Sequence, residues 1–148
     1  MLLYDTNILL YLVRDEQDKV RNLVNPDNDF EAICEVSIGE MFSLVYQLGW
    51  GKTRIEKMND LLSQINVFHI NEDTVKQTYA EIDAYSKNRH PKKTKNGSAI
   101  KMGKNDIWIA SIASLAQIKL ITTDKDFDHL DTTFLKLQKI DPKLFVFP

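Results

Sequence analysis

Short apolar runs that alternate with helix-patterned segments constrain the fold of this chain more than any other feature. Strands are predicted at residues 2–5 ("LLYD"), 30–36, 66–70 and 119–123, with one or two further β-like runs in the tail, residues 134–147. Helical spacing covers residues 6–13, 16–24, 37–49, 51–65, 71–87 and 105–117. In one of these segments Ile55, Met58 and Leu62 share a face. This alternation predicts an α/β fold, with a parallel sheet covered by helices on both faces.

Length and composition place the chain among ordinary globular domains. Its 148 residues predict a single domain, residues 1–148, without internal repeats. The net charge of −2 does not by itself indicate nucleic-acid binding. Cys34 is the only cysteine, so it cannot form an internal disulfide, and its apolar neighbours predict a buried thiol. The start, "MLLYDTNILLYLV", lacks a basic leader and a cleavage site, so we expect no signal peptide, no membrane span and a cytoplasmic protein.

The acid-rich stretch "TDKDFDHLD", residues 123–131, resembles a calcium loop only at its start. Asp124, Asp126 and Asp128 follow the first three ligand positions of an EF-hand. The sixth position, where the loop needs glycine, is His129, and the twelfth, where it needs a bidentate glutamate, is Leu135. The stretch is therefore not a self-sufficient calcium site.

Three other motifs also fail on their spacing. The tripeptide "GKT" at residues 51–53 lacks the earlier glycine of a phosphate loop, because Tyr46 stands there. In "YDTN" the second acid of an aspartyl phosphatase motif is replaced by Asn7. The three histidines and the single cysteine have no paired metal-ligand spacing, so any metal would be bound by oxygen ligands.

Four acids stand at junctions of the alternating pattern. Asp5 ends the first strand, Glu40 lies on an apolar helix, Asp106 begins another, and Asp124 follows the last clear strand. Each has a simpler explanation: Asp5 as a helix N-cap, Glu40 in a capping box with Ser37, Asp106 at a helix dipole, Asp124 in a turn. Sites of parallel sheets form beyond the carboxyl ends of strands, so Asp5 and Asp124 are expected to meet at one edge.

The four segments that carry these acids resemble a known family. "LLYDTNILLYL", "SIGEMFSL", "GKNDIWIASIA" and "LITTDKDF" are similar, in the same order, to the four motifs of PIN-domain ribonucleases, and above all to VapC-type toxins of toxin–antitoxin pairs. The resemblance implies a three-layer α/β/α PIN-like fold with a central, mostly parallel sheet. It also implies a metal-dependent endoribonuclease that uses Mg²⁺ or Mn²⁺, with an antitoxin partner and a homodimeric state. The matched catalytic and metal-binding residues would be Asp5, Glu40, Asp106 and Asp124.

The resemblance extends to supporting residues and has two departures. Thr6, Asn7 and Thr123 are expected to support the metal ligands. The family's fourth motif often carries asparagine where Asp124 stands, and Asp126 competes for the same ligand role. The segment before the third motif is also longer than the short link usual in the family.

A divalent ion would give this acid cluster a chemical purpose. A phosphodiester is already anionic, so bare carboxylates would repel it, whereas bound Mg²⁺ reverses the sign and stabilises attacking and leaving oxygens. Mg²⁺ prefers oxygen ligands and keeps several waters, so three or four carboxylates suffice. Without metal, the carboxylates would raise one another's pKa values, and we expect metal binding to be coupled to local order.

The long segment, residues 87–104, is predicted to be a flexible basic linker without any acid. Such an arm beside an acidic site can follow a phosphate backbone, although a merely solvated loop would have the same composition. The RNA-binding residues expected there are Lys92, Lys93, Lys95, Lys101 and Lys104. Apolar residues after Glu40 fit either the core or a partner groove, and Trp108 and Ile109 are expected to pack inside. The rival functions are an inactive RNA-binding scaffold and a metal-dependent DNA nuclease or phosphatase.

Overall fold

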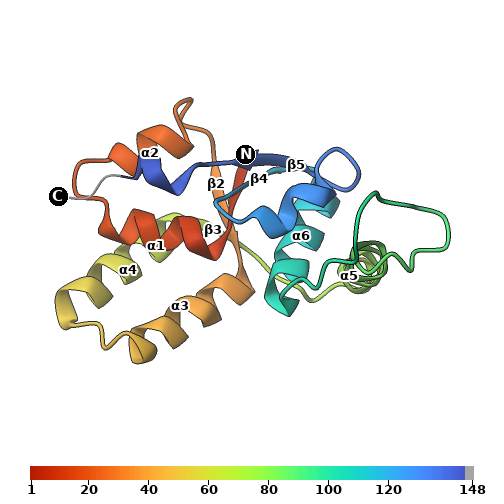
Figure 1. The fold of residues 1–148 in the computed structure, drawn as a ribbon. Helices are drawn as coiled ribbons and strands as arrows, with labels where there is room; N and C mark the ends of the chain where they lie inside the picture. Colours follow the sequence, from red (N-terminus) through yellow and green to blue (C-terminus); the bar gives the residue numbers. More distant parts are fainter. Residues whose placement is uncertain (146–148) are drawn as a thin grey trace.

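The predicted parallel sheet is present, with five strands. The computed structural model describes residues 1–145. Its strands are β1 (Leu2–Tyr4), β2 (Glu31–Cys34), β3 (Asn66–Phe68), β4 (Lys119–Thr122) and β5 (Lys136–Lys139), all parallel to their neighbours, in the order β3-β2-β1-β4-β5 (Figure 1). The first strand of the chain, β1, therefore lies in the middle of the sheet, between β2 and β4.

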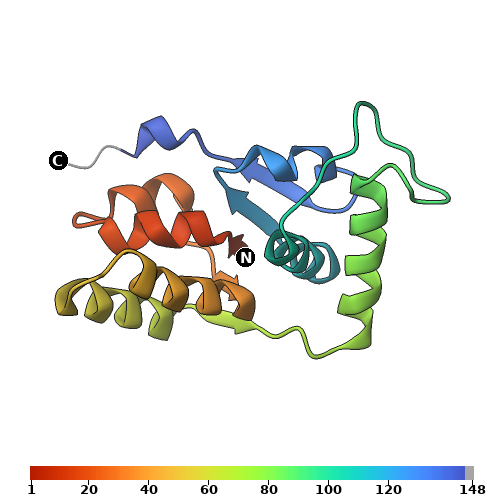
Figure 2. The same cartoon turned by 60° about the horizontal axis from the view of Figure 1, so that its bottom comes forward.

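Helices cover both faces of this sheet. One layer contains α1 (Thr6–Arg14), α2 (Lys19–Val24), α3 (Glu35–Gln47) and α4 (Lys52–Gln64), and the other contains α5 (Asp73–Ser86) and α6 (Lys104–Ala116). Figure 2 shows these two groups of helices on opposite sides of the strands. The predicted three-layer α/β/α architecture is confirmed. Among the described residues, no helix has the length and apolar character needed to cross a membrane.

Side chains of the central strand β1 pack into two separate hydrophobic cores. Leu2 and Tyr4 pack into the core beneath α1–α4, whereas Leu3 packs into the core beneath α5 and α6. This alternation follows from the two-residue period of a strand, and it makes β1 apolar throughout because both faces are buried. Cys34 is buried as predicted, and so is Ile109; Trp108 is partly buried and packs on Tyr79, with ring centroids 4.3 Å apart.

Several predicted boundaries are displaced by one to three residues; for example, the strand predicted over residues 66–70 ends at Phe68, and the helix predicted from residue 71 begins at Asp73. The helix predicted from residue 16 begins at Lys19, because the Asp15 carboxylate accepts hydrogen bonds from the first free N–H groups, those of Lys19 and Val20, at 3.0 and 2.8 Å. The strand predicted over residues 30–36 ends at Cys34, and α3 begins directly at Glu35. In the tail, β5 is the one strand among the described residues; positions 146 and 147 of the predicted β-like run lie outside them.

Candidate active site

Asp5 is the centre of the site, at the carboxyl end of β1. Its Oδ1 accepts a hydrogen bond from the backbone N–H of Thr6 at 2.7 Å, so Asp5 does cap α1 as one interpretation predicted. Its Oδ2 accepts a bond from the hydroxyl of Thr122, at the end of β4, also at 2.7 Å. Asp5 is only 3% exposed, and burial raises its pKa to about 6, against the lowering effect of these two hydrogen bonds.

Glu40 reaches the same place from α3. Its Oε2 accepts a hydrogen bond from the hydroxyl of Thr6, and its Oε1 accepts one from the side-chain amide of Asn105 at 2.9 Å. The capping-box interpretation of Glu40 is wrong, because Ser37 lies inside α3 and the N-cap is Cys34. The carboxylate of Glu40 is thus turned toward the sheet edge rather than back to its own helix end.

Asp106 completes the group from the first turn of α6. Its pKa is raised to about 7, first by burial and then by the negative charges of Asp5, Glu40 and Asp124. The α6 N-cap is Gly103, which has no side chain to clash with this carboxylate. A Cβ at residue 103 would lie 2.6 Å from Oδ2 of Asp106, so glycine is what allows the carboxylate to lie there.

Asp124 and Asp126 stand beside these three acids. The Asp124 carboxylate accepts a bond from the N–H of Asp126 at 2.9 Å, and so caps a 3-10 turn, η1 (Lys125–Leu130). Asp124 therefore caps this turn, and Asp126 lies within it. The negative charge of Asp124 raises the pKa of both Asp5 and Asp106, whereas that of Asp126 raises the pKa of Asp106. The choice of Asp124 over Asp126 as fourth ligand stays a prediction.

An open pocket of about 650 Å³ lies at the sheet edge, lined by residues from α1, α3 and the start of α6. Its lining includes Asp5, Glu40 and Asp106 together with Thr6 and Asn7. Three of the four acids named from the sequence therefore line one cavity, and Asp124 is not part of its lining. Burial raises the pKa values of Asp5 and Asp106, and the negative charges crowded around them raise these pKa values further.

The donor atoms are those that a hard divalent ion requires. Carboxylate oxygens suit Mg²⁺ or Mn²⁺, and a positive ion would offset the repulsion that raises these pKa values. As the side chains stand, no three acidic, histidine or cysteine residues between positions 1 and 145 form a ready-made metal cage. Both oxygens of Asp5 and both of Glu40 also accept hydrogen bonds from neighbours. The residues fit the ion chemically, and each hydrogen-bonded carboxylate oxygen keeps a second lone pair for it.

Two residues of the site were missed from the sequence. Thr122 contacts Asp5 and also accepts a hydrogen bond from the N–H of Asp124 at 2.9 Å; Thr123 was named instead, and its supporting role stays a prediction. Asn105 contacts Glu40, 65 positions earlier in the sequence. The signal for Asn105 was its place beside Asp106, at the start of an apolar helix.

Comparison with known proteins agrees with this geometry. The family model for the PIN domain matches residues 2–132. The chain belongs to the PIN-domain family. No curated protein matches the chain in sequence.

Solved structures share the fold of this PIN domain at low sequence identity. A chain of VapBC2 from Rickettsia felis, solved with a DNA fragment from their promoter, is 21% identical with a TM-score of 0.72, and the match covers 95% of this chain and 98% of that one. A chain of VapBC-1 from nontypeable Haemophilus influenzae is 23% identical with a TM-score of 0.67, and the match covers 93% of this chain and 96% of that one. A chain of VapBC-5 from Mycobacterium tuberculosis, described as a member of the VapBC family of toxin-antitoxin systems, is 17% identical with a TM-score of 0.63. The match covers 93% of this chain and 97% of that one.

The basic segment of this PIN domain folds back on itself and on α5. Lys93 lies 3.4 Å from a carboxylate oxygen of Glu81 and 4.4 Å from the ring centroid of Phe134, and Lys95 bonds the carbonyl of Ser98. Figure 2 shows the segment standing out beyond α5, on the side away from α1–α4. Lys104, by contrast, is exposed at the start of α6, two positions before Asp106.

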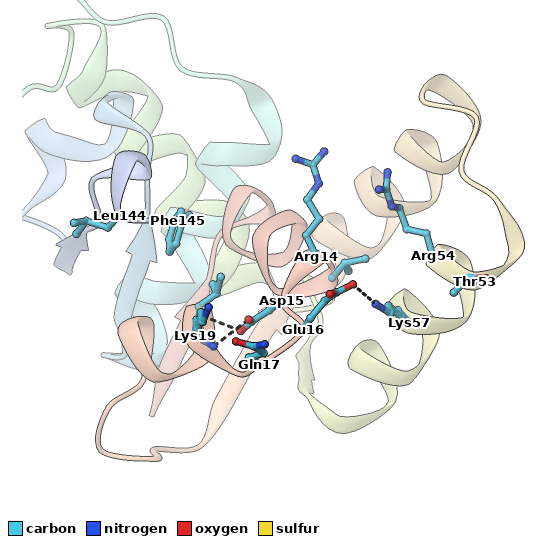
Figure 3. Close-up of a pocket in the computed structure, with 12 residues that line it drawn as sticks. Arg14, Asp15, Glu16, Gln17, Lys19, Thr53, Arg54, Lys57, Leu144 and Phe145 are labelled. Atoms are coloured by element: carbon cyan, nitrogen blue, oxygen red, sulfur yellow. Dashed lines mark hydrogen bonds and ion pairs between the residues drawn. The ribbon is translucent and has the colours of Figure 1, made fainter. Parts of the chain in front are cut away.

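A second pocket, of about 730 Å³, lies at the other end of α1 (Figure 3). Buried side chains of Val13, Val20 and Phe145 contribute to its lining, and Figure 3 shows Arg14 and Arg54 extending in the same direction beside it. The acids of its lining are already engaged: Asp15 caps α2, and Glu16 pairs with Lys57 at 3.5 Å. Among the described residues, the cations of Arg14, Lys19 and Arg54 form no ion pair.

Proposed function

We propose that this protein is a metal-dependent endoribonuclease and the toxin of a toxin–antitoxin pair, acting in the cytoplasm. The observation that carries the proposal is the convergence of Asp5, Glu40 and Asp106 on one pocket of a PIN domain. Two of these acids have raised pKa values, which is expected where carboxylates are gathered for a cation. The solved structures that share the fold include a toxin-antitoxin system, which supports the biological role.

The side chains divide the work between binding and orientation. Asp5, Glu40 and Asp106, with Asp124 or Asp126, would hold Mg²⁺ or Mn²⁺. When bound, the ion supplies positive charge for the anionic phosphodiester and acidifies a coordinated water. Thr122 fixes one oxygen of Asp5, and Thr6 fixes one oxygen of Glu40, so the carboxylates are aimed before substrate arrives. The expected reaction is in-line hydrolysis that leaves a 5′-phosphate and a 3′-hydroxyl.

A cleavage assay with three substrates tests the reaction and its rivals. Single-stranded RNA, DNA of the same sequence and a simple phosphomonoester are incubated with Mg²⁺ and either the wild-type protein or Asp106→Asn. We expect cleavage of RNA alone, reduced at least a hundredfold in the variant. Faster cleavage of DNA or the monoester would favour the rival enzymes, and RNA binding without cleavage would favour an inactive scaffold. Equal cleavage by both proteins would refute the assigned site.

The basic segment is proposed to contact the RNA backbone. Each phosphate neutralised on single-stranded RNA adds about 0.7 to the slope of log affinity against log salt. Replacing Lys92, Lys93 and Lys95 by alanine should therefore weaken RNA binding and reduce that slope by about 2. An unchanged slope would show a merely solvated loop. Because Lys93 pairs with Glu81, the variant's melting temperature is the control for an indirect effect.

The second pocket is proposed to receive the antitoxin. Its apolar floor and its three cations without ion pairs suit a segment that presents apolar and acidic side chains together. A small antitoxin gene directly upstream is expected, and its product is the binding partner to test by titration calorimetry. Reversing charge in Arg14→Glu and Arg54→Glu should weaken binding at least tenfold, whereas Lys76→Glu, on α5 in the other layer, should not. Equal binding by all three variants would place the antitoxin elsewhere.

Homodimer formation is proposed on the outer face of α3. Phe42 is 47% exposed and Tyr46 87%, four positions apart on the same helix, and Leu48 just beyond is 54% exposed. Apolar side chains grouped in this way are typical of protein interfaces. Sedimentation equilibrium should show a dimer for the wild-type protein and a monomer for Tyr46→Glu. A monomeric wild-type protein would refute this proposal without affecting the assigned active site.

A further inference from the structure

One carboxylate ties together three helices at the candidate active site. Glu40 comes from α3, the hydroxyl of Thr6 comes from the first residue of α1, and the amide of Asn105 comes from the first turn of α6. Thr6 donates to Oε2 and Asn105 to Oε1, the latter at 2.9 Å. Each carboxylate oxygen of Glu40 is therefore held by a donor from a different helix.

The charges around Glu40 explain why it needs such donors. Its negative charge raises the pKa of both Asp5 and Asp106, so the three acids repel one another when ionised. Glu40 is half-buried on a long side chain, and repulsion alone would favour rotamers that turn it out to water. Hydrogen bonds to a charged acceptor are stronger than neutral ones and oppose that rotation.

The direction of the Asn105 bond separates this role from ordinary helix capping. An N-cap side chain accepts a bond from a free backbone N–H, whereas the side-chain nitrogen of Asn105 donates. The N-cap of α6 is Gly103, and no side chain caps that helix end. The opposite orientation of the amide would turn its oxygen toward the Glu40 carboxylate and be repelled, so the charge of Glu40 fixes the donor orientation.

We propose that Asn105 is a positioning residue that holds Glu40 in the pocket for divalent-ion binding. The inference rests on the proposed metal-dependent function and assigns Asn105 a part in it. Asn105 acts through Glu40 and needs no contact with substrate. Removal of a partner that orients a ligand typically lowers metal affinity by about 10- to 100-fold. Asn105→Ala should therefore weaken Mn²⁺ binding at least tenfold, with the fold retained.

A double-mutant cycle tests the claim that Asn105 acts through Glu40. Mn²⁺ affinity is measured by titration calorimetry for the wild-type protein, Asn105→Ala, Glu40→Ala and the double variant. Asn105→Ala should weaken binding in the wild-type background and have no further effect once Glu40 is alanine. Asn105→Ser, which keeps a donor, should recover part of the affinity. The matched control is Asn66→Ala. The side-chain amide of Asn66 donates a hydrogen bond of 3.0 Å to the carbonyl oxygen of Glu31, a contact that does not involve the acids of the site.

The outcomes separate this inference from the proposed function. Unchanged Mn²⁺ affinity in Asn105→Ala, or equal losses in both backgrounds, would overturn the positioning role while leaving the enzyme assignment intact. Absence of Mn²⁺ binding and of RNA cleavage in the wild-type protein would overturn the proposed function. The melting temperatures of the same four proteins, measured without metal, test the contact between Asn105 and Glu40. If Asn105 holds Glu40, the losses of the two single variants should not add up in the double variant. Additive losses would overturn that contact as well.

Discussion

Replacing Asp106 by asparagine should stabilise the metal-free protein at neutral pH while removing its activity. Asp106 carries a pKa of about 7 instead of 3.8, because it is buried and faces the charges of Asp5 and Glu40. An acid whose pKa is raised by folding costs nothing where both states are protonated. The cost grows as the pH rises from about 4 to about 7 and is complete above that. Asparagine is neutral throughout and does not incur it.

The size of the effect follows from the same pKa values. The gap between about 7 and 3.8 corresponds to about 4 kcal/mol, at about 1.4 kcal/mol per pKa unit. Asp106 is partly exposed at the pocket, so water screens the repulsion and about 1–2 kcal/mol is the realistic share. Against this, an acid in the first turn of α6 contributes up to about 1 kcal/mol through the helix dipole. The net expectation is that Asp106→Asn gains about 1 kcal/mol at pH 8.

Urea unfolding in the presence of a chelator measures this difference. Wild type and Asp106→Asn are compared at pH 4 and pH 8, with Asp27→Asn as the control because Asp27 is exposed in a turn. The stability advantage of Asp106→Asn should be near zero at pH 4 and grow toward pH 8, and the control should show no such trend. A variant less stable than the wild type at pH 8, or an advantage that does not change with pH, would refute the electrostatic reasoning.

Three further changes probe the same site. Gly103→Ala should cut Mg²⁺-dependent RNA cleavage at least tenfold, because its Cβ would lie 2.6 Å from Oδ2 of Asp106; Gly51→Ala, at a helix N-cap with no atom near its would-be Cβ, should not. Thr122→Val removes a hydrogen bond that lowers the pKa of Asp5, so the acidic limb of the pH–rate profile should move to higher pH; an unmoved limb would contradict this. Mn²⁺ at a hundred times its Kd should stabilise the wild-type protein by about 2.7 kcal/mol, seen as a higher melting temperature that Asp106→Asn lacks.

The fold could be predicted because its pattern is local. The run "LLY" is apolar throughout, as required by a strand with both faces buried, and the last three residues of "KLIT" are buried as well. The helices between the strands keep a regular period. The missed start of α2, by contrast, depends on side-chain hydrogen bonds. The start of α2 is set by Asp15 reaching forward to three backbone N–H groups, including that of Arg21, which periodicity does not reveal.

The site could be predicted in part, for a related reason. Asp5 directly follows β1 and Asp124 comes two positions after the end of β4, so their meeting follows from a parallel sheet. Thr122 and Asn105 form side-chain hydrogen bonds across 117 and 65 positions of sequence, and no local pattern shows which acid each of them contacts. The two roles considered for Asp5 are compatible. Its carboxylate caps α1 and also lines the pocket.

The strand order explains why the acids gather at Asp5. From β1 the chain adds β2 and then β3 on one side, and later β4 and β5 on the other, so the direction of winding reverses at β1 (Figure 1). The segments that follow the neighbouring strands β1 and β4, α1 and η1, pack on opposite faces of the sheet, and a crevice opens between them. Asp5 lies at that point, α3 follows β2 on one side, and α6 precedes β4 on the other. Glu40 and Asp106 thus flank Asp5 because of the winding, and moving Asp5 to the end of an edge strand such as β3 would leave an acid without partners.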